Sequence, residues 1–202
     1  MGVKELKNKA LKLAAAAVVA LGCHIPASAV TLFSDTFNRA DSSTVGNGWT
    51  ESGLAPSSLA IVQNMLQLRD PNAIATHSVV STVGYTNITL DITWAGLPDS
   101  EVLDELFVEW RNIANGAWTR AATLSMGSTS FQSQTIPLTG AEQSALFQFR
   151  LFGDASLNNE GALVDVVTLN GVAAPVPEPA SGLLLVMGAA GLLALARLRR
   201  RG

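Results

Sequence analysis

The chain has 202 residues, of which 13 are Lys or Arg and 16 are Asp or Glu, so its formal net charge is −3. This length allows one ordinary domain with an extension at each end. Charge is unevenly distributed, because the stretch from Val30 to Pro179 holds five arginines, no lysine and fifteen acidic residues, for a net charge of −10. Such a surface repels phosphate backbones and excludes nucleic acid as a partner.

The cysteine and histidine content excludes several kinds of site. The single cysteine, Cys23, lies near the N-terminus, so the central segment has no disulfide and no thiolate zinc site. The only histidine of that segment is His77, which excludes a multi-histidine metal centre; it has no nucleophile elbow beside it and is predicted to be an ordinary strand residue. Cys23 could also be a lipoprotein processing site, but Ala20 stands where a large aliphatic residue is preferred.

Residues 1–29 are predicted to be a secretory signal peptide. Four lysines precede an apolar run over residues 13–21, which is too short to span a bilayer. Ala27 and Ala29 then supply small side chains at the −3 and −1 positions of a cleavage site. We therefore expect export through the Sec translocon, cleavage by signal peptidase and a mature chain that begins at Val30.

Residues 30–174 are predicted to form an antiparallel β-sandwich of the jelly-roll type, because period-two alternation dominates them. In residues 86–94, for example, Ile88, Leu90 and Ile92 alternate with polar side chains. Turn-forming Gly, Asn and Pro separate the runs. The expected strands are residues 31–37, 59–68 with a turn near Asn64, 73–81, 86–94, 103–111, 117–124, 130–136, 145–151 and 162–169. Residues 172–176 are expected to be a linker.

Four stretches of this segment resemble the concanavalin A-like and galactose-binding-like jelly rolls of bacterial exported proteins. They are residues 33–49, residues 109–119 with a glycine turn before Trp118-Thr119, residues 149–152 and residues 161–171. The resemblance covers most of the domain and implies a lectin-like sandwich. Fold alone does not fix function.

Sugar binding is one candidate function, because lectin-like sites stack exposed aromatic rings on pyranose rings. The candidate binding residues are Trp49, Trp118, Arg120 and Phe107. The alternative for both tryptophans is that they cap the core of the sandwich. Trp94 and Trp110 alternate with polar residues and are predicted to be core residues.

Calcium is the only candidate cofactor. Asp165 interrupts an apolar strand, and a buried carboxylate needs a partner. Jelly rolls often bring the first and last strands together, so Asp35 or Asp41 could join Asp165 around the ion. The alternative is that Asp165 pairs with an arginine or lies on an exposed edge.

A divergent glycosidase is the third candidate, and the chain is predicted not to be an enzyme. Retaining glycosidases need two carboxylates about 5 Å apart. Concanavalin-like glucanases place their acids along one strand, and here Glu105, Phe107 and Glu109 share a face. Phe107 stands where the central acid would be.

Residues 175–202 are predicted to be a sorting tail in three parts. Pro177-Glu178-Pro179 comes first, residues 180–196 form an apolar helix long enough to span a bilayer, and arginines end the chain. These arginines mark the cytoplasmic end, so the domain lies outside. The basic cluster consists of Arg197, Arg199, Arg200 and Arg201.

Residues 176–201 resemble the PEP-CTERM sorting signal of Gram-negative bacteria. The resemblance implies recognition by an exosortase, transient anchoring in the inner membrane and then delivery to the cell surface or extracellular matrix. A plain C-terminal membrane anchor is the alternative. The predicted function is that of an exported, non-enzymatic structural or adhesive protein linked to extracellular polysaccharide, and a carbohydrate-binding module is the alternative.

Overall fold

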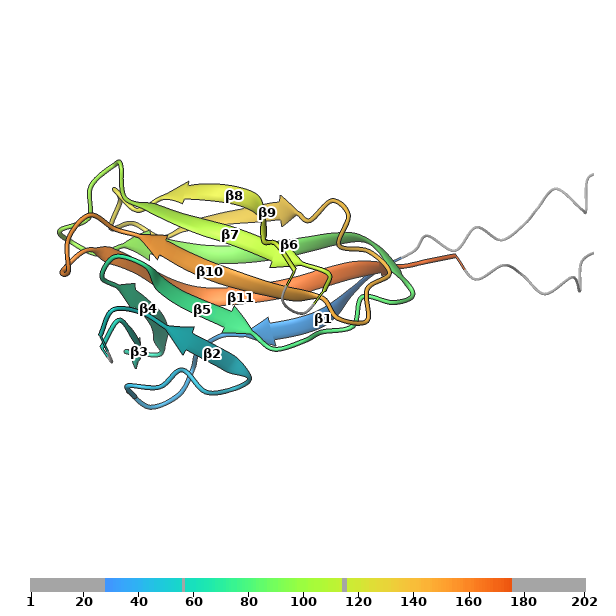
Figure 1. The fold of residues 1–202 in the computed structure, drawn as a ribbon, viewed down its shortest axis with the longest axis horizontal. Helices are drawn as coiled ribbons and strands as arrows, with labels where there is room; N and C mark the ends of the chain where they lie inside the picture. Colours follow the sequence, from blue (N-terminus) through green and yellow to red (C-terminus); the bar gives the residue numbers. More distant parts are fainter. Residues whose placement is uncertain (1–27, 56, 114–115, 176–202) are drawn as a thin grey trace, which may run out of the picture.

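The computed structural model describes residues 28–55, 57–113 and 116–175. All regular elements of these residues are β-strands, and no helix among them is long and apolar enough to cross a membrane (Figure 1). The strands are β1 (Ala29–Asp35), β2 (Trp49–Ser52), β3 (Leu59–Val62), β4 (Met65–Arg69), β5 (Ala73–His77), β6 (Tyr85–Gly96), β7 (Glu105–Arg111), β8 (Thr119–Ser125), β9 (Gln132–Pro137), β10 (Gln148–Asp154) and β11 (Gly161–Ala173).

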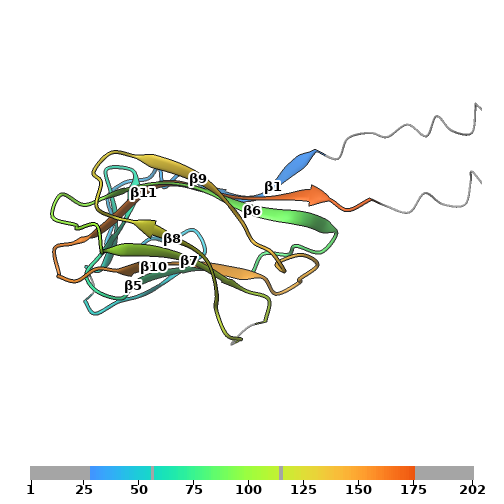
Figure 2. The same ribbon diagram turned by 90° about the horizontal axis from the view of Figure 1, so that it is seen from above.

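Two antiparallel sheets pack face to face, which confirms the predicted all-β sandwich (Figure 2). The six-stranded sheet has the order β3-β4-β11-β6-β9, and β1 also pairs with β11. The five-stranded sheet has the order β2-β5-β10-β7-β8. The first and last strands are therefore neighbours, as expected, and both ends of the described chain lie at the same end of the sandwich.

The core lies between the sheets and follows the alternation of the sequence. On β6, Ile88, Leu90 and Ile92 are at most 1% exposed. Trp94 and Trp110 are buried as well, which confirms their prediction as core residues. Removing each large apolar side chain from water contributes about 1.5 to 3 kcal/mol to folding, so this inner layer supplies the main driving force.

The turn between β3 and β4 explains why the predicted strand over residues 59–68 is a hairpin. Gln63 and Asn64 form a two-residue loop, and both have positive φ values, 52° and 62°. Two positive φ values produce the turn whose twist matches that of the flanking strands. The turn expected near Asn64 is confirmed.

Most strand boundaries shift by a few residues from the predicted ones, and three differences are larger in their consequence. The strand β2 is absent from the predicted strands, because only four residues pair with β5 and three of them are polar. β5 ends at His77 rather than at residue 81, and Val80 makes only an isolated bridge to Phe147. β11 continues to Ala173, since Val172 and Ala173 still pair with β6, so the expected linker over residues 172–176 overlaps the strand.

The predicted targeting segments lie almost entirely outside the described residues. Residues 1–27 hold most of the predicted signal peptide, and only Ala29 of its two cleavage-site alanines is described, as the first residue of β1. Residues 176–202 hold the predicted sorting motif, apolar helix and basic cluster.

Candidate functional site

Asp35, at the end of β1, organises a buried polar network. Its carboxylate accepts hydrogen bonds from the Phe37 backbone N–H at 2.8 Å, from both Nη atoms of Arg39 at 2.9 and 3.1 Å, from Asn47 Nδ2 at 3.1 Å and from Trp49 Nε1 at 2.9 Å. Burial alone would raise the pKa of Asp35, but these donors outweigh it and lower the pKa below its ordinary value. The Asp35 carboxylate therefore stabilises the loop between β1 and β2, from which most of these donors come.

Trp49 is part of the core, which corrects its prediction as a sugar-binding residue. Its side chain is 7% exposed. The ring makes edge contacts with Phe33, His77 and Phe149, at centroid distances of 6.1, 5.2 and 5.5 Å. The alternative, that Trp49 caps the core, is the one that the structure supports, because no ring face is free to stack on a sugar.

The three carboxylates considered as calcium ligands are not grouped. In the part of the chain that the structure describes, no three His, Cys, Asp or Glu side chains lie close enough to hold one metal ion. Asp41 accepts a hydrogen bond from the Gln63 backbone at 2.8 Å. Asp165 is exposed, because the pairing of β11 with β6 shifts by one residue between Val164 and Val166. This bulge turns Asp165 away from the core.

His77 ends β5 as the predicted strand histidine. It is buried among Phe33, Trp49 and Phe149, and its Nδ1 lies 2.9 Å from the Ser78 carbonyl oxygen. Burial lowers the pKa of His77, so the imidazole is neutral at pH 7. Its position in the core gives it no access to a substrate.

The outer face of the five-stranded sheet carries a dense layer of arginines and aromatic rings. We call this layer the arginine–aromatic face. It is built from outward-facing residues of β7, β8 and β10, and from one tryptophan just before β8. Its members are Phe107, Glu109, Arg111, Trp118, Arg120, Arg150 and Phe152.

Glu109 is the centre of this face. It is 5% exposed although it lies on the outward side of β7. Its Oε1 accepts a hydrogen bond from Arg120 Nε at 3.2 Å, and its Oε2 accepts one from Arg150 Nε at 2.7 Å. Two guanidinium groups thus compensate the cost of burying one carboxylate and are held in fixed positions by it.

The aromatic rings lie against these guanidinium groups. The Trp118 ring centroid is 4.3 Å from Arg111 Cζ and 4.4 Å from Arg150 Cζ. Arg120 Cζ lies 3.2 Å from the centroid of Phe107. These distances are in the range of cation–π attraction, so each ring and each guanidinium restrains its neighbours. Trp118 itself remains partly exposed.

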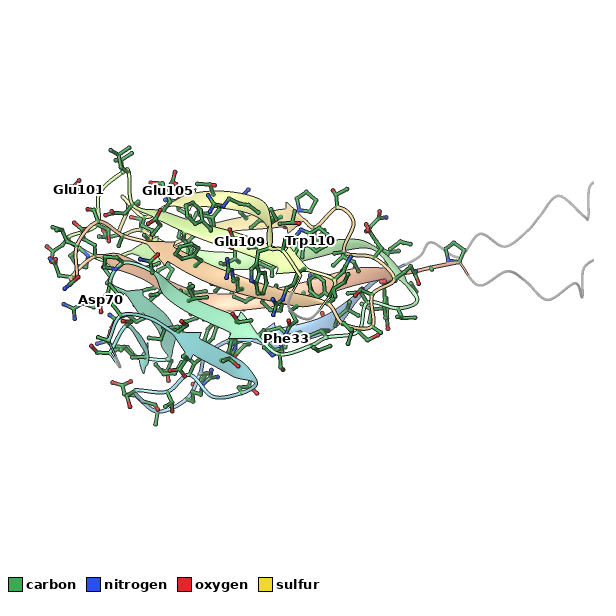
Figure 3. The ribbon with its side chains drawn as sticks, in the orientation of Figure 1. Phe33, Asp70, Glu101, Glu105, Glu109 and Trp110 are labelled. Atoms are coloured by element: carbon green, nitrogen blue, oxygen red, sulfur yellow. The ribbon has the colours of Figure 1, made fainter. Side chains whose placement is uncertain are left out.

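Strand register arranges the face in three rows. Glu105 pairs with Asp154, Phe107 with Phe152, and Glu109 with Arg150. Figure 3 labels Glu105 and Glu109, which lie four residues apart on β7. The face therefore has an acidic row, an aromatic row and an arginine row.

Glu105 and Glu109 do not form a glycosidase pair. Four residues along a strand span about 13 Å, more than the separation that either class of glycosidase uses. Both oxygens of Glu109 also accept hydrogen bonds from arginines. The sequence correctly predicts that Glu105, Phe107 and Glu109 share a face. It does not predict the burial of Phe107 and Glu109, because Arg120 and Arg150, which contact them, come from the neighbouring strands β8 and β10.

The opposite face of the sandwich has a groove of about 240 Å³ between β6, β9 and β11. Its lining includes Asp91, Thr93, Ser133 and Thr135 but no aromatic residue. The carboxylate of Asp91 accepts hydrogen bonds from Thr135 Oγ1 and from Asn170 Nδ2. This carboxylate is thus used within the sheet, and the groove lacks an aromatic ring on which a sugar could stack.

Comparisons with known proteins show the fold. No protein-family model matches the chain, and no curated protein matches it. The structure is similar to the CBM22-1 xylan-binding domain from a Paenibacillus barcinonensis enzyme, with 16% identity, a TM-score of 0.50 and coverage of 74% of this chain and 99% of that one.

Two further solved structures share the sandwich. The K2 cleaved adhesin domain of Lys-gingipain has 10% identity and a TM-score of 0.50, over 70% of this chain and 98% of that one. An arabinose-bound α-L-arabinofuranosidase has 13% identity and a TM-score of 0.53, over 67% of this chain but only 25% of the enzyme. At these identities, the similarity establishes the β-sandwich fold alone.

Proposed function

We propose that the protein is a non-catalytic carbohydrate-binding protein that acts outside the cell, and that its binding site is the arginine–aromatic face. The observation that carries this proposal is the partly exposed ring of Trp118, set against the guanidinium groups of Arg111 and Arg150. An aromatic ring beside polar donors is the usual composition of a small-ligand site.

The chemistry of the face suits a sugar ring. The C–H side of a pyranose is apolar and stacks on an indole, while its hydroxyl groups accept hydrogen bonds from guanidinium N–H groups. Since Glu109 and the neighbouring rings already hold Arg120 and Arg150, binding costs little side-chain ordering. Similarity to a xylan-binding domain supports the same class of ligand without identifying it.

Affinity electrophoresis of the full-length chain tests this proposal. The chain is kept in a sugar-free non-ionic detergent and run through gels that contain one polysaccharide each. We expect retardation by at least one polysaccharide and its loss in Trp118→Ala. Parent and variant that migrate alike in every gel would contradict the proposed site.

We also propose that an exosortase sorts the protein through its C-terminal tail. This second proposal rests on the order of Pro177-Glu178-Pro179, the apolar residues 180–196 and the terminal arginines. Export with transient anchoring in the inner membrane would deliver the sandwich to the cell surface or extracellular matrix. A carbohydrate-binding face on a protein at that location would give it an adhesive or structural role in extracellular polysaccharide.

Mutation separates the sorting motif from a plain anchor. Replacing Pro177, Glu178 and Pro179 by Ala leaves the apolar segment and the arginines intact, so membrane insertion should survive. We expect an unprocessed precursor to accumulate in the inner membrane, as it should for the native chain in an exosortase-null strain. Normal processing in both cases would leave the plain anchor as the correct interpretation.

A further inference from the structure

We propose that the ligand of the arginine–aromatic face is an acidic polysaccharide, with its anionic groups bound at the arginine row. This inference rests on the proposed function and adds a ligand class to it. The shared chemistry is an anionic group on a sugar, which is either a carboxylate or a sulfate ester.

Arginines are concentrated on this face in an otherwise acidic domain. Among the described residues, Arg111, Arg120 and Arg150 belong to the face, and only two other arginines exist. Arg39 is paired with Asp35, and Arg69 Nε donates to a loop carbonyl. The arginine–aromatic face therefore holds three of the five arginines among the described residues.

The local charge balance is positive at the arginine row. Arg120 and Arg150 pair with Glu109, and Arg111 lies beside this row, opposite Gln148. Glu109 offsets one of these three guanidinium charges, which leaves a charge of +2 at this end of the face. The acidic row of Glu105 and Asp154 lies four residues further along the strands, at about 13 Å. That separation exceeds the screening length of about 8 Å at physiological ionic strength, so the acidic row does little to cancel the positive charge.

Arg120 presents free hydrogen-bond donors at this row. Its side chain is 45% exposed, and its Nε is used on Glu109. Within the described residues, its two Nη groups have no hydrogen-bond partner. Stacking on Phe107 fixes the plane of the guanidinium, so that these donors are preorganised for an oxygen pair of a carboxylate or sulfate.

The order of the rows also predicts the orientation of the ligand. An anionic substituent is attracted to the arginine row and repelled by the carboxylates of Glu105 and Asp154. The sugar ring that carries it can then stack on the exposed part of Trp118, which contacts Arg111 and Arg150. A neutral chain would gain the stacking but not the charge-assisted bonds.

Two matched pairs of polymers test this inference on the full-length chain in sugar-free non-ionic detergent. Polygalacturonate is compared with the same polymer after carboxyl reduction, and dextran sulfate with dextran. We expect at least one charged polymer to bind about tenfold more tightly than its neutral counterpart, since hydrogen bonds to charged groups are the stronger ones. The pair that shows the difference identifies carboxylate or sulfate as the bound group.

Arg120→Gln should lose about tenfold in affinity for the charged polymer and less than twofold for the neutral one. Arg69→Gln is the matched control, because it removes the same charge elsewhere on the sandwich and should change neither affinity. An equal loss in both variants would mean unspecific charge attraction and would overturn the inference.

The remaining outcomes separate the inference from the proposed function. Equal or tighter binding of the neutral polymers, with loss in Trp118→Ala, overturns the acidic ligand and leaves carbohydrate binding intact. Binding to none of the four polymers overturns the acidic-polysaccharide inference. In that case, retardation by another, neutral polysaccharide would still support the proposed function.

Discussion

Trp49 Nε1 donates a 2.9 Å hydrogen bond to Asp35 Oδ2, and both residues are buried. The bond joins the end of β1, in the six-stranded sheet, to the start of β2, in the five-stranded sheet. It therefore connects the two layers of the sandwich at the point where the chain crosses between them. Asp35 and Trp49, both predicted as candidate ligand-binding residues, therefore bind each other and hold the two sheets together.

Asp35→Asn should destabilise the fold by about 2 kcal/mol, because it weakens charge-assisted bonds and leaves Arg39 without its counter-charge. The folded pKa of Asp35 lies below the ordinary value of 3.8. Its stabilising contribution is therefore full above that value and is lost as the pH falls through the lower folded pKa. Urea unfolding as a function of pH measures both effects.

Asp165→Asn is the control for this prediction. Asp165 is an exposed carboxylate at a bulge, so its replacement should change stability by less than about 0.5 kcal/mol. Equal losses for the Asp35 and Asp165 variants would show that the buried network does not stabilise the fold.

His77 should make the protein less stable in mild acid. Burial holds the pKa of His77 in the folded protein below the ordinary value of 6.5. Between these two pKa values, the imidazole is protonated in the unfolded chain but neutral in the native state. Stability should fall as the pH drops below 6.5, by at most about 1.4 kcal/mol per pH unit, until the folded pKa is reached.

An NMR titration of the imidazole measures that pKa directly in the folded protein. Unfolding curves at pH 7.5 and 5.5 then give the stability difference, which should shrink in His77→Gln. A folded-state pKa at or above 6.5 would contradict the burial of this ring.

Gly96→Ala should cost about 3 kcal/mol. An added Cβ would lie 1.5 Å from the Met126 carbonyl oxygen, so either the end of β6 or the loop after β8 must move. Gly153→Ala is the matched control, since its Cβ would meet nothing closer than 3.6 Å, and it should be neutral or stabilise by up to about 1 kcal/mol. Thermal unfolding of the two variants compares them, and similar melting temperatures would contradict the close approach at Gly96.

Most of the fold could be predicted from alternation, because a strand with one buried face has an apolar residue at every second position. β6 is the clearest case, with Ile88, Leu90 and Ile92 buried as expected. The strand β2 has too few residues to show a period and exists because β5 lies beside it. The sequence leaves the direction of Asp165 open, because alternation does not reveal the bulge that turns its side chain outward.

The candidate site could be predicted only in part. Trp118 and Arg120 were named from their residue types, and the structure brings them onto the same face of the sheet. The sequence places Glu109 on one face with Glu105 and Phe107, but its ion pair with Arg150 joins residues 41 positions apart in the chain. Such a pair depends on the order of strands in the sheet, which a single sequence does not specify.

The central claim is that the arginine–aromatic face binds carbohydrate, and a comparison of two tryptophan variants tests it most directly. The measurement is the dissociation constant of the retarding polysaccharide for the parent, Trp118→Ala and Trp49→Phe, all shown to be folded by circular dichroism. We expect Trp118→Ala to weaken binding at least tenfold, because the stacking ring is lost. Trp49→Phe should lower stability by about 1 to 2 kcal/mol, through loss of the bond to Asp35, and leave the dissociation constant unchanged. Unchanged affinity in Trp118→Ala, or a loss of affinity confined to Trp49→Phe, would contradict the claim.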